Sequence, residues 1–198
     1  MVAEFGVYIA RGLARIIGFA ANILAGEILD LPDIANEVIH NLCEHLMALH
    51  TRIMWYENGL KQVAKDDARV RLLRTIPGVG AVTASAIIAS IGGGHQFTNG
   101  RGFAAWLGLT PANKSSGGKE NLGRITKMGN QYLRSLLVVG MRSLVRQIKS
   151  HPERASKWLT SLLERKPARV ATVAMANKAA RIVWAVLTRN EPYTPHTA

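Results

Sequence analysis

Residues 72–88 read LLRTIPGVGAVTASAII, and this stretch has the form of a helix-hairpin-helix. Pro77 ends a first apolar helix, because a proline ring cannot continue the helical hydrogen-bond pattern. Gly78 and Gly80 permit a tight turn and a close backbone approach, and Val79 between them can pack between the two helices. A second apolar helix follows directly. The stretch therefore predicts a helical protein that is organised around this hairpin.

The start of the second helix is also a candidate contact for nucleic acid. Its free amide groups and the positive end of the helix dipole can hold a phosphate without reading base sequence. The alternative is a plain helix turn whose small residues allow close packing. The basic surroundings of the hairpin favour nucleic acid, so we take Gly78, Val79 and Gly80 as candidate DNA-binding residues.

The net charge of +12 is distributed unevenly along the 198 residues. Residues 1–70 carry a net charge of −3, residues 71–150 carry +10 and residues 151–198 carry +5. Glu120 is the single carboxylate of the middle segment, so the cations there need an external polyanion as partner. These cations are scattered through glycine-rich turns rather than along one helix face, which argues against a membrane surface. We expect DNA as the partner.

The remaining composition points to a cytoplasmic protein. One cysteine, Cys43, cannot form an internal disulfide, which suits a reducing compartment. The longest uncharged run near the N-terminus, residues 16–26, is too short to cross a bilayer. We therefore expect no membrane attachment and a location in the cytoplasm at the nucleoid.

A long helix is predicted to begin after Pro32 and to carry a heptad seam. Its apolar residues recur at alternating intervals of three and four, as the core positions of a coiled coil do. The seam predicts a homo-oligomer through residues 39–63, and a long helix packed on its own domain is the alternative. Its members are Ile39, Leu42, Leu46, Leu49, Ile53, Tyr56, Leu60 and Val63.

Shorter helices punctuated by glycine are predicted beyond this seam, with no alternating pattern of strands. They cover residues 69–75, 81–91, 101–107, 130–150, 157–165 and 168–189. The predicted fold class is all-α, with a long coiled-coil-like helix followed by a compact helix-hairpin-helix domain. The predicted divisions are an N-terminal helical segment at 1–70, the helix-hairpin-helix domain at 71–150, and C-terminal helices with an irregular tail at 151–198.

Residues 111–123, PANKSSGGKENLG, contain two serines among glycines and lysines. A serine hydroxyl that attacks a phosphodiester forms a phosphoseryl intermediate, and nearby cations neutralise the charge that builds on the phosphoryl oxygens. Ser115 and Ser116 are the candidate nucleophiles. The surrounding cations are Lys114, Lys119, Arg124 and Lys127. Taken alone, these residues favour a phosphate-binding or merely flexible loop over a catalytic one.

No metal site is predicted within the chain. Magnesium-dependent strand transfer needs several carboxylates around the ion, and the basic centre cannot supply them. His40, His45 and His50 recur every five residues, which turns each about 140° from the last on a helix. They cannot converge on one ion.

Four segments, together with Phe97, Leu133 and Arg134, resemble the C-terminal transposase domain of the insertion sequence 110/116/902 family. The resemblance runs in order from about residue 72 to residue 146. The segments are 76–80 (IPGVG), 106–111 (WLGLTP), 115–119 (SSGGK) and 122–130 (LGRITKMGN). The preceding heptads and the following helices also suit the layout of that family.

The resemblance implies a DNA recombinase whose serine attacks DNA, a transposase. In the family this serine lies in the Ser-Gly pair after the Gly-Leu-Thr-Pro turn, which corresponds to Ser116, with Ser115 as second choice. Lys119, Arg124, Lys127 and Arg134 are then phosphate-binding or charge-stabilising groups, with Lys114 beside them. The family also implies magnesium, held by an acidic N-terminal domain that this chain does not contain, and for some members a guide RNA.

Two other functions remain as alternatives. A non-catalytic DNA- or RNA-binding module could be built on the hairpin at residues 76–80, or the chain could be an oligomerisation fragment that acts through its heptads. One departure from the family pattern bears on the choice. Ala112 stands where the family often has arginine, which removes one expected phosphate contact.

Overall fold

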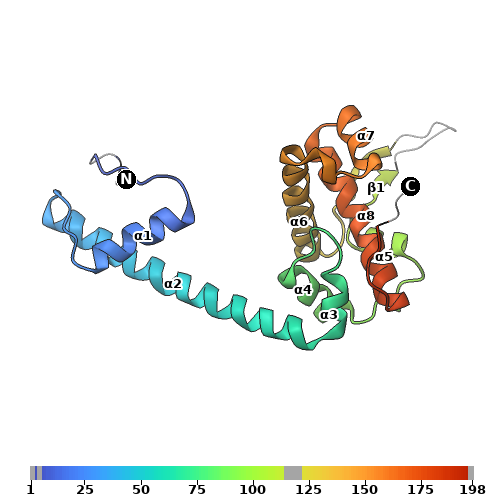
Figure 1. Cartoon of the computed structure of the whole chain (residues 1–198), viewed down its shortest axis with the longest axis horizontal. Helices are drawn as coiled ribbons and strands as arrows, with labels where there is room; N and C mark the ends of the chain where they lie inside the picture. The colour runs from blue at the N-terminus through green and yellow to red at the C-terminus, as the bar shows by residue number, and fades with distance from the viewer. Residues whose placement is uncertain (1–2, 4–5, 114–121, 196–198) are drawn as a thin grey trace. The chain divides into compact units, whose positions relative to one another are not determined.

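The structure is a computed structural model that describes residues 3, 6–113 and 122–195. The described residues are mostly helical, with one two-stranded sheet, which confirms the all-α class (Figure 1). The helices are α1 (Leu13–Leu24), α2 (Asp33–Asp66), α3 (Ala68–Leu73), α4 (Ala81–Ile91), α5 (Gly100–Trp106), α6 (Gln131–Ser150), α7 (Lys157–Arg165) and α8 (Ala168–Arg189), with a short 3-10 turn, η2 (Pro152–Arg154). These bounds lie within one or two residues of the predicted helices from residue 69 onward.

The chain divides into two compact units, Met1–Gly59 and Leu60–Ala198. The first unit has a small core in which Ala20 and Ile23 of α1 pack with Ile39 and Cys43 of α2. Burial raises the pKa of the Cys43 thiol, so this side chain is a neutral packing group. The Asn36 side chain donates hydrogen bonds to the carbonyls of Leu29 and Leu31 at 3.1 and 3.0 Å, which fixes the connection between the helices.

Helix α2 confirms the predicted long helix, but most of its heptad seam is uncovered. Ile39 is buried and Leu46 packs at the edge of the small core. Five other seam residues are between 44% and 57% exposed: Leu42, Leu49, Ile53, Tyr56 and Val63. The core of the first unit therefore uses only the beginning of the seam.

The second unit is built around α8. This helix packs against α6, α5 and α3. It is the one described helix that is long and apolar enough to cross a membrane, judged by length and composition alone. Ala176, Ala180 and Val183 of α8 are fully buried in the core of this unit, together with Phe103 of α5 and Leu137 of α6. The apolar character of α8 thus serves the packing of a globular unit.

The predicted helix-hairpin-helix is present as α3, a turn and α4. Asp67 begins α3 as its N-cap and accepts a hydrogen bond from the Arg69 amide at 2.8 Å. Hydrogen bonds from the Arg69 side chain hold the pKa of Asp67 below its ordinary value. Ile76 and Val79 are buried, so Val79 fills the space between the helices as expected.

The small sheet was not predicted. Strands β1 (Pro111–Asn113) and β2 (Leu122–Ile125) pair antiparallel, with Pro111 opposite Ile125 and Asn113 opposite Leu122. Each strand is too short to show an alternating pattern, and proline, asparagine and glycine are weak strand formers. The pairing follows from how the flanking helices place the two chain segments, which the local sequence does not indicate.

Candidate nucleic-acid interface

The two strands carry the loop in which the candidate nucleophile lies. Ser116, the second choice Ser115, and the cations Lys114 and Lys119 fall outside the described residues. The structure does describe both ends of the loop, Asn113 on β1 and Leu122 on β2. The geometry of the site therefore rests on how these two strands are held.

The base of the hairpin is fixed by two interlocking glycines. Gly108 follows α5 and Gly129 precedes α6, and both have a positive φ, 69° and 130°. A side chain on Gly129 would overlap the carbonyl oxygen of Trp106, and one on Gly108 would meet the backbone of Met128. Only glycine permits this approach at both positions. The backbone leaving α5 is thereby locked against the backbone entering α6.

Hydrogen bonds extend this lock along the chain. The Lys127 amide donates to the Gly108 carbonyl at 3.1 Å, and the Thr126 amide donates to the Thr110 carbonyl at 2.9 Å. The next helix begins at once, because the Asn130 side chain accepts from the Leu133 amide at 3.0 Å and caps α6. These hydrogen bonds therefore fix the base of the strand pair between the end of α5 and the start of α6.

Two side chains from helices tie down the carbonyls that lead into β1. Arg134 of α6 donates through Nη1 to the Leu107 carbonyl at 2.9 Å. Asn177 of α8 donates through Nδ2 to the Leu109 carbonyl at 3.1 Å. Arg134, a predicted phosphate contact, is half-buried here and uses one of its five N–H donors on the backbone.

The predicted cations of β2 and the turn after it point away from the core. Arg124 is exposed, whereas the next residue, Ile125, is half-buried and packs against the core. Lys127 is exposed and has a positive φ of 57°, in the left-handed region. Arg124 and Lys127 thus lie on the solvent side of a fixed hairpin base.

The glycines of the helix-hairpin-helix turn differ in their surroundings. Gly78 has φ +82°, and an added side chain would meet Met141 and the Gly140 backbone of α6. Gly80 begins α4 without a side-chain cap, and a side chain added there would meet nothing within 4 Å. Gly78 therefore docks the turn on α6, while Gly80 leaves the start of α4 open to solvent.

Helix α6 is the element that the two predicted features share. Gly140 receives the hairpin turn, and Asn130 at the helix start closes the base of the strand pair. Ten residues separate these two positions, which corresponds to about 15 Å along the helix axis. Helix α6 thus holds both the solvent-exposed start of α4 and the exposed cations of β2.

A metal site was not expected in this chain. Among residues 3, 6–113 and 122–195, no three His, Cys, Asp or Glu side chains come together to hold an ion. The magnesium that the resemblance implies has no fitting ligand set among these residues.

Sequence reasoning missed Gly108, Gly129 and Asn177 as residues that build the site. Gly129 carried a usable signal, because a glycine directly before an asparagine N-cap indicates a sharp helix entry. Asn177 was a lone amide in the alanine-rich run 174–180 (AMANKAA) of a buried helix, and such an amide needs a hydrogen-bond partner.

Sequence comparisons find known relatives over almost the whole chain. Residues 70–157 match the family model described as "Transposase IS116/IS110/IS902 family". A "Probable family 20 transposase" of Pseudomonas aeruginosa is 41% identical over 98% of this chain and 58% of its own length. The "Transposase for insertion sequence element IS1111A" of Coxiella burnetii is 42% identical over 98% of the chain and 53% of its own length.

A more distant relative matches a similar extent. The "Transposase for insertion sequence element IS1328" of Yersinia enterocolitica is 35% identical over 96% of the chain and 56% of its own length. The chain therefore spans about half the length of the curated relatives that it matches.

Proposed function

This chain belongs to the IS116/IS110/IS902 transposase family through residues 70–157, and on that premise we propose that it acts in DNA transposition or site-specific recombination with Ser116 as the nucleophile. The observation that carries the proposal is the hairpin base. It is locked by glycines and helix side chains, and it bears exposed cations at the root of the serine loop. A fixed base of this kind suits a loop that must position a reacting atom.

The proposed reaction is a transesterification. The Ser116 hydroxyl loses its proton to solvent or a nearby base, and its oxygen forms a bond to the phosphorus of a phosphodiester. The bond from phosphorus to one ester oxygen breaks, and the leaving oxygen takes up a proton. Lys114, Lys119, Arg124 and Lys127 neutralise the phosphoryl oxygens, and Arg134 helps to hold the phosphate. Ser115 is the second candidate for the attacking group.

We propose that DNA is held at two places on the support formed by α6. The start of α4, at Gly80, contacts a phosphate through backbone amides, with Gly78 and Val79 shaping the turn. The cations of β2 and the following turn contact the strand that is cut. The net charge of +10 between residues 71 and 150 supports a polyanionic partner. A guide RNA is a further partner that the family resemblance suggests.

The proposed assembly includes more than one polypeptide segment. The carboxylates of an acidic domain that is not part of these 198 residues would hold the magnesium. A second copy of the chain pairs along residues 39–63, where most of the heptad seam of α2 is exposed. The site of action is the cytoplasm, at the nucleoid.

Covalent trapping tests the proposal. The chain is produced together with the part of the Pseudomonas aeruginosa relative that has no counterpart in these 198 residues. The cells also carry the gene for this chain with its flanking DNA. We expect a protein–DNA adduct that survives denaturation and that Ser116→Ala abolishes, while DNA binding changes little because one hydroxyl carries no charge. Ser115→Ala is the matched control and should retain the adduct. DNA binding without any adduct would favour the non-catalytic binding module instead.

A further inference from the structure

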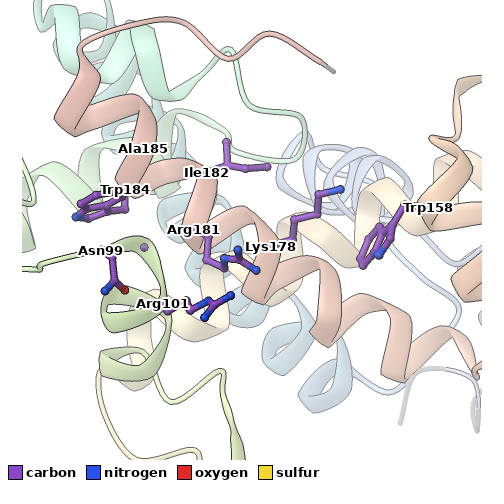
Figure 2. Close-up of a pocket in the computed structure, with 9 residues that line it drawn as sticks. Asn99, Arg101, Trp158, Lys178, Arg181, Ile182, Trp184 and Ala185 are labelled. Carbon is purple, nitrogen blue, oxygen red and sulfur yellow. The ribbon is translucent and has the colours of Figure 1, made fainter. Parts of the chain in front are cut away.

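A second basic site lies in a pocket of the second unit, lined by residues of α5, α7 and α8. Its volume is about 690 Å³, within the range of sites that take a small molecule or a nucleotide. Arg101, Lys178 and Arg181 line it together with Trp158 and Trp184, and we call it the basic pocket (Figure 2). Of these residues, only Arg101 falls within the range that matches the transposase family.

The walls of the basic pocket are fixed by close packing. A side chain on Gly100 would crowd the Arg181 backbone at 3.0 Å, so glycine lets the start of α5 rest directly on α8. The Trp184 indole donates through Nε1 to the Phe97 carbonyl at 3.1 Å, which ties the loop before α5 to α8. Asn99 caps α5 by accepting from the Gly102 amide at 2.9 Å. Arg101 and Arg181 are therefore held side by side on rigid elements.

The charges in the basic pocket are uncompensated within the described chain. Figure 2 shows the guanidinium groups of Arg101 and Arg181 on the same side of α8. The described lining contains no carboxylate, and no described carboxylate forms an ion pair with Arg101, Lys178 or Arg181. Like charges that share one cavity repel, and an anion between them relieves that repulsion. The pocket is thus suited to a phosphate.

An aromatic platform stands beside these cations. Trp158, the second residue of α7, is 41% exposed although its ring is large and apolar. The Lys178 ammonium lies 4.3 Å from the centroid of its ring, a cation–π contact that sets the two side chains next to each other. An accessible indole next to a basic cluster is the arrangement with which proteins stack an unpaired base and neutralise its phosphate.

We propose that the basic pocket binds an unpaired nucleotide of a single-stranded nucleic acid. Arg101 and Arg181 contact its phosphate, and its base stacks on the exposed part of the Trp158 ring, beside the part that the Lys178 ammonium covers. Duplex is excluded from this contact because its bases stack on one another and cannot reach the indole. This proposal rests on the proposed function because both require a nucleic acid as partner. It concerns a separate surface, and it concerns single strands, whereas the proposed interface at α4 and β2 binds duplex DNA.

The test compares single strands with duplex on the full chain. Fluorescence anisotropy is measured with dT12, with U12 and with a 20-base-pair duplex, each end-labelled. Arg101→Ala/Arg181→Ala should weaken the binding of single strands about tenfold or more, and Trp158→Ala about fivefold or more. Neither variant should change the affinity for duplex by more than about twofold relative to the control variant Arg169→Ala/Arg189→Ala. The relative affinities for dT12 and U12 identify whether DNA or RNA is the source of the nucleotide.

A charge-matched control separates a site from a general electrostatic effect. Arg169→Ala/Arg189→Ala removes two exposed arginines of the same helix that do not line the basic pocket. Equal losses in this variant and in Arg101→Ala/Arg181→Ala would overturn the proposal. Because Trp158→Ala also removes packing, Trp158→Phe serves as a second variant. It should keep most of the affinity while abolishing most of the quenching of tryptophan fluorescence that dT12 causes in the native chain.

The remaining outcomes also separate the two proposals. A chain that binds duplex with strong salt dependence but does not bind dT12 or U12 would contradict the basic pocket and leave the proposed function standing. A chain that binds neither duplex nor single strands would contradict the proposed function, and the pocket proposal with it. Native single-strand binding that is lost in the pocket variants alone supports the proposal.

Discussion

Helices α6 and α2 are both long and amphipathic, but they treat their apolar faces in opposite ways. Leu133, Leu137 and Met141 of α6 are at most 2% exposed, because α4 and α8 cover them. Leu49 and Ile53 of α2 are 44% and 55% exposed. Similar side chains on similar helices are thus buried in one region and open to water in the other.

The spacing of the apolar residues explains the contrast. Buried residues of α6 recur mostly every four positions, from Leu133 to Val145, a stripe that several crossing helices can share. The α2 seam repeats every 3.5 residues on average, which keeps it facing one long partner. The apolar stripe of α6 is buried within its own unit, whereas the exposed seam of α2 is consistent with the proposed pairing with a second chain.

Replacing Gly140 by Ala should have the largest effect. The new methyl group would overlap the Gly78 carbonyl oxygen, so the hairpin turn could no longer dock on α6. We expect the free energy of unfolding to fall by about 2–3 kcal/mol in urea titrations. Gly102→Ala in α5 is the control, because the new methyl group would lie 3.8 Å from its nearest neighbour, Asn99 Oδ1, and it should be neutral or slightly stabilising. Equal stability of the two variants would show that α6 does not need this contact.

The double substitution Leu49→Asp/Ile53→Asp should abolish self-association. Two carboxylates in the seam must be desolvated when chains pair, which should weaken the dimer by about 100-fold or more in sedimentation velocity. Thermal unfolding of the isolated chain should change little, since both residues are exposed. Met54→Asp/Trp55→Asp, exposed and off the seam, is the control and should still associate. A native chain that sediments as a monomer at all concentrations would break the comparison.

Arg124→Ala should have a moderate effect on duplex DNA affinity and none on stability. The side chain is exposed on β2, so its loss removes one phosphate contact and no packing. The affinity should fall several-fold, and the slope of log affinity against log salt, roughly −5 for six phosphates, should become shallower by about one. Arg52→Ala, an exposed cation of α2, should leave both quantities unchanged. An equal change in the two variants would remove β2 from the interface.

The smallest expected effect concerns Asp67, the N-cap between α2 and α3. Asp67→Ala should lower the free energy of unfolding at pH 7 by about 1 kcal/mol. Hydrogen bonds from Arg69 lower the pKa of this carboxyl, so its contribution is present above its ordinary pKa and is lost as the pH falls through the lowered value. The difference between the native chain and the variant should therefore shrink below about pH 4. A difference that stays constant down to pH 3 would assign it to packing.

Periodicity and turn chemistry were enough to predict the helices. The Pro-Gly pair at 77–78 marked the hairpin, and the intervals of three and four marked α2, because both signals are local. The strand pair and the basic pocket could not be predicted in the same way. They depend on contacts such as those of Gly129 with Trp106 and of Gly100 with Arg181, which join residues far apart in the chain. A glycine's sequence neighbours do not reveal which distant backbone it will meet.

The most direct test of the account is to locate the residue that carries DNA in the trapped adduct. Trypsin cleaves after Lys114 and Lys119, so both serines fall in the peptide 115–119 (SSGGK). After nuclease trimming, mass spectrometry should find this peptide with a nucleotide attached, and fragmentation should place the nucleotide on Ser116. A nucleotide on Ser115, on any residue outside this peptide, or on no residue of this chain although recombination proceeds, would contradict the account.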